Sequence, residues 1–440
     1  MFCGIKNIIM LNKKKICVLG QGYVGLPLTV SLSKYFKVLA FDINKKKINN
    51  LKRGLDKESI LGKKFLNKNI SFSSSILDLK NYNVFIIAVP TPVNLKKKPD
   101  LRNLISATNI VATFLKENDL VIYESTVYPG TTEEICVPIL EKKSKLLVSN
   151  NHNTLNLKTF DCAYCPERVN PGDRARTVDK IVKVISASSD RALGSVYDLY
   201  KKISKSGICK AKSIKIAESA KIIENVQRDI NIALINEFYI LFRKMNLNIR
   251  DILDVASTKW NFLNFKPGLV GGHCIGVDPY YLTYKAKELK YQPKLILAGR
   301  KINDSMSSFV FNDLLKIKKK KLGNLKKIKV LVLGYSFKEN VSDYRNTKVS
   351  EIIDKLSKKK FIIDIYDPHI PLENITQTKK KLFIKKINKE KCQYHIILYA
   401  VDHRIFKKIN YQYLNHKLKG NGFVYDLTDK FPRNLVSGRL

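Results

Sequence analysis

Short apolar runs separated by turns are the main pattern in the first half of the chain. Four of them lie at Ile16–Leu19, Val38–Phe41, Val84–Val89 and Leu120–Tyr123. Continuous apolar runs of this length are typical of strands that a parallel sheet buries on both faces. Between the first two runs, residues 24–32 carry apolar side chains at helical spacing. The pattern therefore predicts a parallel α/β sheet.

A long helix is predicted in the middle of the chain. Residues 213–245 keep a helical pattern and contain neither proline nor glycine. Because this is longer than an ordinary globular helix, we expect a central helix that spans two domains or forms the seam of a dimer. A glycine-rich loop follows at residues 266–279, and another helical stretch comes after it.

The alternation of strands and turns recurs in the last third of the chain. Apolar runs that we interpret as strands lie at Val330–Gly334, Phe361–Tyr366, Ile396–Ala400 and Phe423–Asp426. The first two end in a glycine and an Asp-Pro pair, much as the first two strands of the N-terminal half end in glycine and aspartate. We therefore predict a second Rossmann-like domain. Its first turn keeps a single glycine, so it should bind something other than a dinucleotide.

The strong positive charge leaves this fold unchanged but poses a question of function. The formal net charge is +42, and the 80 lysines and arginines form short runs along the whole chain. Nucleic-acid-binding proteins usually concentrate such residues in one tail, stripe or helix. We interpret the charge as solvated surface lysine. Nucleic-acid binding remains an alternative, as does a positive field that attracts anionic ligands.

Cysteine usage and hydropathy indicate a cytoplasmic protein. The eight cysteines are scattered, which suits reduced thiols better than a disulfide framework. Cys162 and Cys165 form a C-x-x-C pair, but no second pair follows, so we expect no metal site. No apolar run is long enough to span a membrane. Residues 1–9 make a poor signal peptide, and Met10 is a plausible original start.

A glycine turn after the first predicted strand points to a dinucleotide. Gly20, Gly22 and Gly25 form G-x-G-x-x-G, and Asp42 closes the second strand. Glycines in this arrangement let the backbone approach a pyrophosphate at a helix N-terminus. An acid at the end of the second strand accepts hydrogen bonds from ribose hydroxyls, which favours NAD over NADP. Lys47 tempers that preference, because a cation there could meet a 2′-phosphate.

Two further loops should border the same ligand. They contain Thr91 and Thr126 and follow the third and fourth predicted strands. Ligands of open parallel sheets lie at the carboxyl ends of the strands, so we expect both threonines near the cofactor.

The long helix carries a row of hydrogen-bond donors. Lys221, Asn225 and Arg228 are four and three residues apart, so they share one face. Such a row suits a substrate that is anionic or develops an oxyanion. Glu224 and Asp229 lie near this face without cancelling it. For an isolated helix, a solvated polar face would be the simpler interpretation.

The glycine-rich loop places a cysteine in an accessible position. Cys274 follows Gly271 and Gly272 and precedes Gly276, and these small neighbours give a thiol access to a ligand. A thiolate is a strong nucleophile when cations lie near it. Asp278, four residues on, could activate a water or the thiol. The alternative is a cysteine that acts only as a small buried hydrophobe.

These motifs together resemble the UDP-glucose/GDP-mannose dehydrogenase superfamily from about Lys14 to the C-terminus. The resemblance rests on residues 20–28, 124–130, 166–172, 266–274 and 334–338, together with Arg345 and the helix of Lys221. The Pro-Glu-Arg and Gly-Gly-His-Cys forms look like the branch that acts on UDP-N-acetylhexosamines. Residues 260–263 and 277–284 look closest to UDP-N-acetylglucosamine 6-dehydrogenases of the Vi polysaccharide type.

The resemblance implies a four-electron oxidation of the sugar C6 hydroxyl to a carboxylate by two NAD. Cys274 would add to the C6 aldehyde as a thiohemiacetal, and a second hydride transfer would give a thioester that water hydrolyses. Lys221 and Asn225 would steady the oxyanion, and Asp278 would assist proton transfer. Further roles near the thioester, holding or polarising water, fall to Glu167 and Thr126.

One departure from the family bears on the substrate. The UDP-glucose branch carries a second glutamate four residues after the position of Glu167, where this chain has Pro171. This argues against UDP-glucose. UDP-N-acetylglucosamine is the expected substrate, for surface polysaccharide synthesis, with UDP-N-acetylgalactosamine and UDP-N-acetylmannosamine as alternatives. A non-catalytic nucleotide-binding protein is an alternative from another class.

The resemblance also assigns binding residues and domains. We expect residues 10–208 to form an NAD-binding Rossmann domain, 209–310 a central helical, dimerisation and catalytic domain, and 311–440 a UDP-sugar-binding Rossmann-like domain. A homodimer through the central helices is expected, without membrane insertion, nucleic acid or metal. The expected cofactor contacts are Gly20, Gly22, Tyr23, Val24, Gly25, Asp42, Lys47, Thr91, Thr126 and Arg345. The expected substrate contacts are Arg168, Val169, Lys221, Asn225, Arg228, Lys266, Gly272, Tyr335, Phe337 and Lys338.

Overall fold

The computed structural model describes residues 14–56, 65–94, 96–151, 157–169, 177–387 and 393–440. The chain divides into two compact units. The first unit comprises residues 1–224 and 280–291, and the second comprises residues 225–279 and 292–440. Residues 1–9, Met10 and the substrate-related Pro171 lie outside the described residues.

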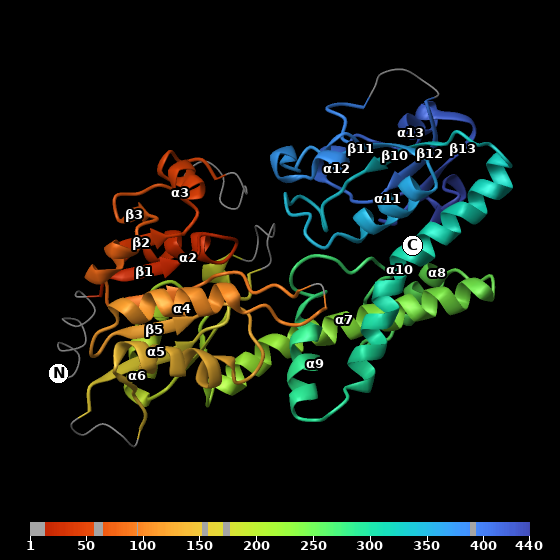
Figure 1. Cartoon of the computed structure of the whole chain (residues 1–440). Coiled ribbons are helices and arrows are strands. Elements are labelled where there is room, and N and C mark those ends of the chain that lie inside the picture. The colour runs from red at the N-terminus through yellow and green to blue at the C-terminus, as the bar shows by residue number, and fades with distance from the viewer. Residues whose placement is uncertain (1–13, 57–64, 95, 152–156, 170–176, 388–392) are drawn as a thin grey trace. The chain divides into compact units, whose positions relative to one another are not determined.

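A mostly parallel sheet forms the centre of the first unit (Figure 1), as predicted. The strands run in the order β3-β2-β1-β4-β5-β7-β8-β9, with β6 beside β7, and only β7 and β8 pair antiparallel. Three predicted strands have the predicted bounds, whereas the third ends at Ile87 instead of Val89. The strands are β1 (Ile16–Leu19), β2 (Val38–Phe41), β3 (Ile70–Ser73), β4 (Val84–Ile87), β5 (Leu120–Tyr123), β6 (Leu147–Val148), β7 (Thr159–Tyr164), β8 (Lys183–Ala187) and β9 (Ile208–Lys210).

Helices alternate with these strands and are set by local capping as well as by packing. Asn44 accepts a hydrogen bond from the Lys47 backbone at the start of α3, and Ser189 accepts one from the Ala192 backbone at the start of α6. The helices are α2 (Gly25–Leu32), α3 (Lys45–Lys52), α4 (Arg102–Phe114), α5 (Val137–Ser144) and α6 (Asp190–Lys201), with short turns at Ile76–Asn81, Thr132–Cys136 and Val178–Lys180.

The predicted long helix is α7 (Ile214–Lys244), which has 31 residues. Without an internal proline or glycine, nothing in its sequence breaks the ladder of backbone hydrogen bonds. The division between the two units falls within it, after Glu224. Three more helices follow: α8 (Ile249–Ala256), α9 (Asp278–Glu288) and α10 (Lys294–Leu322). The glycine-rich loop therefore ends at Val277, two residues earlier than the pattern predicts, because Asp278 opens α9.

The second unit contains the predicted second Rossmann-like sheet. Its five strands are all parallel, in the order β11-β10-β12-β13-β14. Their bounds are β10 (Lys329–Leu333), β11 (Ile362–Tyr366), β12 (Tyr394–Tyr399), β13 (Leu418–Asp426) and β14 (Gly438–Arg439). The accompanying helices are α11 (Lys348–Lys358), α12 (Gln377–Lys380) and α13 (Tyr411–Lys417), with short turns at Leu372–Asn374, Arg404–Phe406 and Arg433–Leu435.

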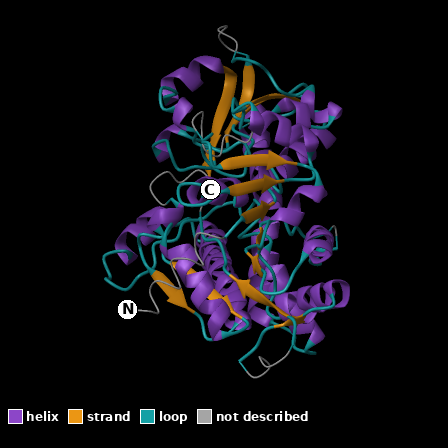
Figure 2. Ribbon diagram, turned by 90° about the vertical axis from the view of Figure 1, so that its left-hand side faces the viewer, coloured by secondary structure: helices purple, strands orange, loops and turns teal. Residues whose placement is uncertain are grey.

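Both faces of this second sheet are buried, which explains why its strands are continuous apolar runs. Along β10, Val330 and Val332 belong to one hydrophobic cluster, and Leu331 and Leu333 belong to another. Successive side chains of a strand point to opposite faces, so the two clusters are the two sides of the sheet. Figure 2 shows helices packed beside the strands in each unit.

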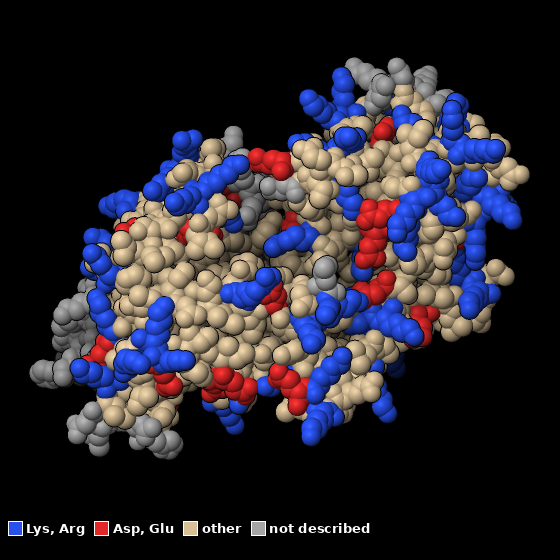
Figure 3. Space-filling model, viewed as in Figure 1, with Lys and Arg blue, Asp and Glu red and all other residues tan. Residues whose placement is uncertain are grey.

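The surface is rich in lysine, as the composition requires. On the face that Figure 3 shows, Lys and Arg side chains are scattered and interspersed with Asp and Glu. Among the described residues, no helix is both long enough and apolar enough to cross a membrane.

Candidate active site

In the glycine turn between β1 and α2, close packing requires glycine at two positions, and open space lies beside a third. Gly20 has a φ of +93°, and a Cβ there would lie 2.7 Å from the Ala88 carbonyl oxygen. A Cβ at Gly25 would lie 1.8 Å from the Gly20 carbonyl oxygen. A Cβ at Gly22 would meet no described atom within 4 Å. Gly20 and Gly25 are therefore required by the fold, whereas Gly22 leaves room for a ligand against the backbone.

Asp42 holds this turn from the end of β2. One carboxylate oxygen accepts a hydrogen bond from the Gln21 backbone at 3.0 Å, and the other accepts one from the Asn44 backbone at 2.9 Å. The Lys47 ammonium donates to the Gln21 carbonyl at 3.3 Å. A carboxylate offers about four acceptor positions, so Asp42 keeps capacity for ribose hydroxyls. The neighbouring Tyr23 and Val24 are half-buried, and the binding roles of all these residues remain predictions.

The loops after β4 and β5 are joined by side-chain hydrogen bonds. The Thr91 hydroxyl donates to the Thr126 carbonyl at 2.6 Å, and the Ser125 hydroxyl donates to the Val89 carbonyl at 2.7 Å. The Tyr281 hydroxyl donates to the Thr91 carbonyl at 2.5 Å. Both loops leave the carboxyl edge of the sheet, where open parallel sheets bind ligands. The structure thus brings Thr91 and Thr126 together, and their predicted place near the cofactor remains a prediction.

Glu167 sits in a buried ionic cluster at the same edge of the first sheet. The Lys183 ammonium lies 3.2 Å from a Glu167 oxygen and 3.0 Å from a Glu124 oxygen. The same Glu124 oxygen accepts a hydrogen bond from the Tyr200 hydroxyl. All four side chains are buried. The Lys183 ammonium therefore compensates the charge of two carboxylates in a place that water does not reach.

The second oxygen of Glu167 organises the segment that follows it. It accepts hydrogen bonds from the backbone of Arg168 at 2.7 Å and of Val169 at 2.9 Å. Both carboxylate oxygens are thus engaged within the first unit. This arrangement fits a group that holds the Arg168–Val169 backbone in place. That Glu167 also holds or polarises a water directly remains a prediction.

Burial also affects the neighbouring carboxyl group. It raises the pKa of Glu124 to about 7, against the lowering effect of Lys183. One Glu124 oxygen has no hydrogen-bond partner in the described structure. The buried Glu124 carboxyl therefore binds a proton more readily than an exposed glutamate does.

Arg168 forms a two-pronged ion pair within the first unit. Its guanidinium lies 2.7 Å and 3.0 Å from the two Glu224 oxygens. Both side chains remain about one third exposed, so Arg168 stays accessible for the predicted substrate contact. Glu224 thereby faces a cation, whereas Asp229 is buried against Arg300 at 2.6 Å. Neither acid opposes the donor row of α7, as the sequence predicts.

The central member of that row contacts the predicted acid. The Asn225 amide donates to an Asp278 oxygen at 2.5 Å, and both side chains are buried. The Cys274 carbonyl accepts a backbone hydrogen bond from Asp278 at 2.8 Å, so the cysteine and the acid lie one turn apart. The structure therefore joins Asn225, Asp278 and Cys274 within the second unit. Lys221 is half-buried, and Arg228 is exposed.

The glycines beside Cys274 are required by close packing. Gly272 has a φ of +82°, and a Cβ there would lie 2.6 Å from the Phe337 ring. A Cβ at Gly271 would lie 2.8 Å from the Asn346 carbonyl oxygen. The Asn346 amide in turn donates to the Gly272 carbonyl at 3.1 Å. Two predicted substrate contacts, Gly272 and Phe337, are thus direct neighbours.

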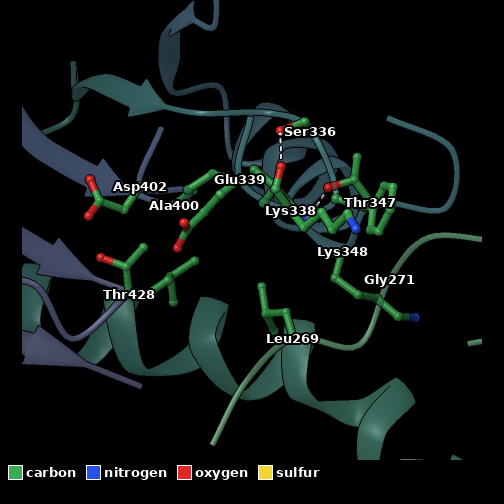
Figure 4. Close-up of a pocket in the computed structure, with 14 residues that line it drawn as sticks. Leu269, Gly271, Ser336, Lys338, Glu339, Thr347, Lys348, Ala400, Asp402 and Thr428 are labelled. Atoms are coloured by element: carbon green, nitrogen blue, oxygen red, sulfur yellow. Dashed lines mark hydrogen bonds between the residues drawn. The ribbon is translucent and has the colours of Figure 1, made fainter. Parts of the chain in front are cut away.

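A pocket of 220 Å³ opens at the carboxyl ends of β10, β12 and β13. Phe337 and Lys338 line it, and their contact with a substrate remains a prediction, while Tyr335 is buried and packs against Phe383. Figure 4 shows Glu339 and Asp402 on one side of the pocket, with Leu269 facing them. Lys266 is exposed in the loop that leads to Leu269. The lining residues are Leu269, Gly271, Ser336, Phe337, Lys338, Glu339, Thr347, Lys348, Val349, Ala400, Val401, Asp402, Leu427 and Thr428.

Sequence reasoning missed several residues at these sites. Lys183, Asp402 and Thr428 give no local signal, because each is an isolated polar residue in the sequence. Glu124 stands in a motif noticed in the sequence, but its burial could not be seen there. His273 was noticed only as part of the glycine loop.

The predicted cofactor contact Arg345 pairs with Asp343 at 2.6 Å.

Three family descriptions match the chain in succession. Residues 14–204 match the UDP-glucose/GDP-mannose dehydrogenase family, NAD binding domain. Residues 215–305 match the central domain of the same family, and residues 331–432 match its UDP binding domain.

Similar proteins extend over nearly the whole chain. A UDP-N-acetyl-D-glucosamine 6-dehydrogenase of Salmonella typhi is 42% identical over 98% of this chain and 99% of its own. One from Pseudomonas aeruginosa is 44% identical over 94% of this chain and 96% of its own. A solved structure of a UDP-D-ManNAc dehydrogenase from Pyrococcus horikoshii is 27% identical, has a TM-score of 0.79, and covers 97% of this chain and 98% of its own.

Proposed function

Since the chain belongs to the UDP-glucose/GDP-mannose dehydrogenase family, we propose that it oxidises C6 of UDP-N-acetylglucosamine to the carboxylate. Membership makes it an NAD-dependent nucleotide-sugar oxidoreductase. The observation that carries the proposal is the Asn225–Asp278 hydrogen bond of 2.5 Å, one turn from Cys274. Asn225, Asp278 and Cys274 thus bring an amide, an acid and a thiol into one small region.

The glycine turn of the first unit suits NAD as the cofactor. The open space beside Gly22 admits a pyrophosphate against the backbone, and Asp42 lies at the end of β2 to receive ribose hydroxyls. When bound, NAD accepts the hydride that leaves C6. Arg345, which Asp343 holds at 2.6 Å, remains a proposed cofactor contact.

Cys274 allows the second oxidation. Its sulfur adds to the C6 aldehyde and forms a C–S bond, which gives a thiohemiacetal. Loss of hydride from C6 then produces a thioester, and attack by water breaks the C–S bond to release the carboxylate. An oxyanion develops during both addition steps, and a fixed amide and ammonium from Asn225 and Lys221 stabilise it. Asp278, held by Asn225, exchanges the proton with the C6 oxygen or water.

The remaining polar residues bind the sugar nucleotide or hold the backbone of its binding site. Glu167 holds the backbone of Arg168 and Val169 through its two hydrogen bonds of 2.7 Å and 2.9 Å. Arg168 and Arg228 offer guanidinium groups to the anionic sugar nucleotide. Phe337 and Lys338, which line the pocket of the second unit, bind the diphosphate or the base of the sugar nucleotide.

The N-acetylglucosamine configuration is favoured by relatives that carry that name and are 42% and 44% identical. The similar UDP-D-ManNAc dehydrogenase structure, at 27% identity, keeps the epimer as a second candidate, and UDP-N-acetylgalactosamine is a third. The uronic acid product is an activated glycosyl donor, so we propose that it supplies a surface polysaccharide. The described cysteines are free thiols, which suits a cytoplasmic enzyme.

We also propose a homodimer through the central helices. Leu234 and Leu241 on α7 are 45% and 48% exposed, and Val255 and Trp260 at and after α8 are 72% and 89% exposed. Leu234 and Leu241 are seven residues apart and so share one face of α7, and apolar side chains gathered on an exposed face mark association surfaces. Sedimentation of the wild type against Trp260→Glu tests this: a dimer that the substitution dissociates supports it, and a monomeric wild type contradicts it.

NADH release from a panel of UDP-sugars tests the activity. We expect two NADH for each UDP-N-acetylglucosamine, and slower or no release with the galacto and manno epimers. Cys274→Ala should abolish the four-electron reaction, whereas Cys209→Ala, at an exposed cysteine of the first unit, should not. No NADH from any UDP-sugar would contradict the proposal.

A further inference from the structure

The residue before the proposed nucleophile is held by an acid from another segment. The His273 Nδ1 lies 2.9 Å from an Asp343 oxygen. Asp343 is buried and also accepts hydrogen bonds from the Arg345 guanidinium at 2.9 Å and 2.6 Å. His273, Asp343 and Arg345 all belong to the second unit. Asp343 therefore holds the imidazole of the residue that precedes Cys274 in the chain.

The electrostatics keep this imidazole protonated at neutral pH. Burial alone would lower the pKa of His273, but hydrogen bonds to Asp343 and to the Cys274 side chain raise it to about 9. Asp343 has a pKa well below its ordinary value: burial opposes this shift, while the bonds from His273 and Arg345 outweigh it. The Arg345 guanidinium, 3.4 Å from His273 Nδ1, opposes protonation of His273.

Packing fixes the ring as firmly as charge does. The His273 ring meets the Phe337 ring edge-on, with centroids 5.8 Å apart. Phe337 in turn fills the space beside Gly272, and Asn346 holds the Gly272 carbonyl at 3.1 Å. The backbone before Cys274 and the His273 ring are thus held by close packing.

We propose that His273 is a further catalytic residue, an imidazolium that donates a hydrogen bond to the Cys274 sulfur and stabilises it as a thiolate, with Asp343 as its positioning residue. This inference rests on the proposed function only in taking Cys274 as the nucleophile. Imidazolium–thiolate pairs are a general way to make a cysteine reactive at neutral pH.

The pair acts at two points of the reaction. The thiolate adds to the C6 aldehyde without first losing a proton, so the C–S bond forms as the carbonyl oxygen becomes an oxyanion. After hydride loss to NAD and addition of water to the thioester, the C–S bond breaks and the electron pair returns to sulfur. The imidazolium stabilises this leaving thiolate and remains protonated throughout.

The pH dependence of alkylation tests the pair directly. Full-length protein is treated with iodoacetamide at a series of pH values, and modification of the Cys274 peptide is followed by mass spectrometry. We expect the wild-type midpoint to lie below the value of about 8.5 of a free cysteine. His273→Gln should move the midpoint up by about one unit, so that alkylation at pH 7 slows roughly tenfold. His416→Gln, at an exposed histidine of α13, should leave the profile unchanged.

Each outcome decides the matter. A wild-type midpoint at or above about 8.5 overturns the inference without any variant, even if His273→Gln does not fold. Equal midpoints in wild type and His273→Gln also overturn it. Asp343→Asn should give an intermediate shift. Since alkylation needs neither NAD nor a sugar, a His273-dependent profile without UDP-sugar oxidation would disprove the proposed function and retain the pair.

Discussion

The Lys183 ammonium lies 3.2 Å from the Glu167 carboxylate, with both side chains at most 6% exposed. A charge buried to this degree requires its partner, because an uncompensated ion in a dry environment is costly. Glu167 shares this cation with Glu124 and uses its other oxygen on the backbone of Arg168 and Val169. The ion cluster therefore determines the local geometry of a proposed substrate-binding segment.

Removing the buried cation should destabilise the first unit. Lys183→Met leaves two buried carboxylates without a cation, and we expect a loss of about 3–5 kcal/mol in the free energy of unfolding. Urea denaturation measures this. Lys180→Met removes an exposed lysine three residues away and should change stability by less than about 0.5 kcal/mol. Equal effects of the two substitutions would show that the cluster contributes nothing to stability.

Asn225 should matter for turnover. Asn225→Ala removes the amide that holds Asp278 and stabilises the oxyanion, so we expect kcat with UDP-N-acetylglucosamine to fall on the order of a hundredfold. Steady-state NADH kinetics measure the change. Gln227→Ala, at an exposed position of the same helix, is the matched control. A kcat within twofold of wild type for Asn225→Ala would exclude the proposed role.

A methyl group at Gly272 should disturb the loop around Cys274. Gly272→Ala strains a φ of +82° and forces the added carbon to 2.6 Å from the Phe337 ring, which we expect to cost about 1–3 kcal/mol and to raise KM. Gly268→Ala is the control, since its Cβ would meet nothing within 4 Å. Thermal unfolding and KM together decide the outcome. If the two alanine variants behave alike, the close packing is not important.

Glu218 should make stability depend on pH. It accepts hydrogen bonds from the backbone of Gly130 at 2.5 Å and Thr132 at 2.9 Å, and burial raises its pKa to about 7. The folded state therefore binds a proton more tightly than the unfolded state. Its stabilising contribution is complete below about 4.3, the ordinary value for Glu, and is lost as the pH rises through about 7.

Comparison with Glu218→Gln isolates this effect, because the other titrating groups stay the same. As the pH rises from about 4.5 to 7, the unfolding free energy of the wild type should fall relative to that of the variant, by on the order of 1–3 kcal/mol. Urea denaturation at several pH values measures it. A difference that stays constant across this range would contradict the raised pKa.

The sequence by itself predicts four strands of each sheet, whereas β3, β6, β7, β8, β9 and β14 are not among the predicted strands. The bounds of β1, β2 and β5 follow from apolar runs closed by turn residues, and the length of α7 follows from the absence of proline and glycine. These are local properties: a residue's neighbours in the chain decide the period of burial and the places where it stops. The family motifs added the nucleophile, the acid and the donor row.

Only the tertiary structure decided which charges are buried together. Lys183 is one of 80 basic residues, and its partners Glu124 and Glu167 lie 59 and 16 residues away in sequence. His273 meets Asp343 seventy positions later, a pairing that no local pattern indicates. The reason is physical: a charged side chain looks the same in sequence whether water or another side chain compensates it, and only the packed fold removes the water.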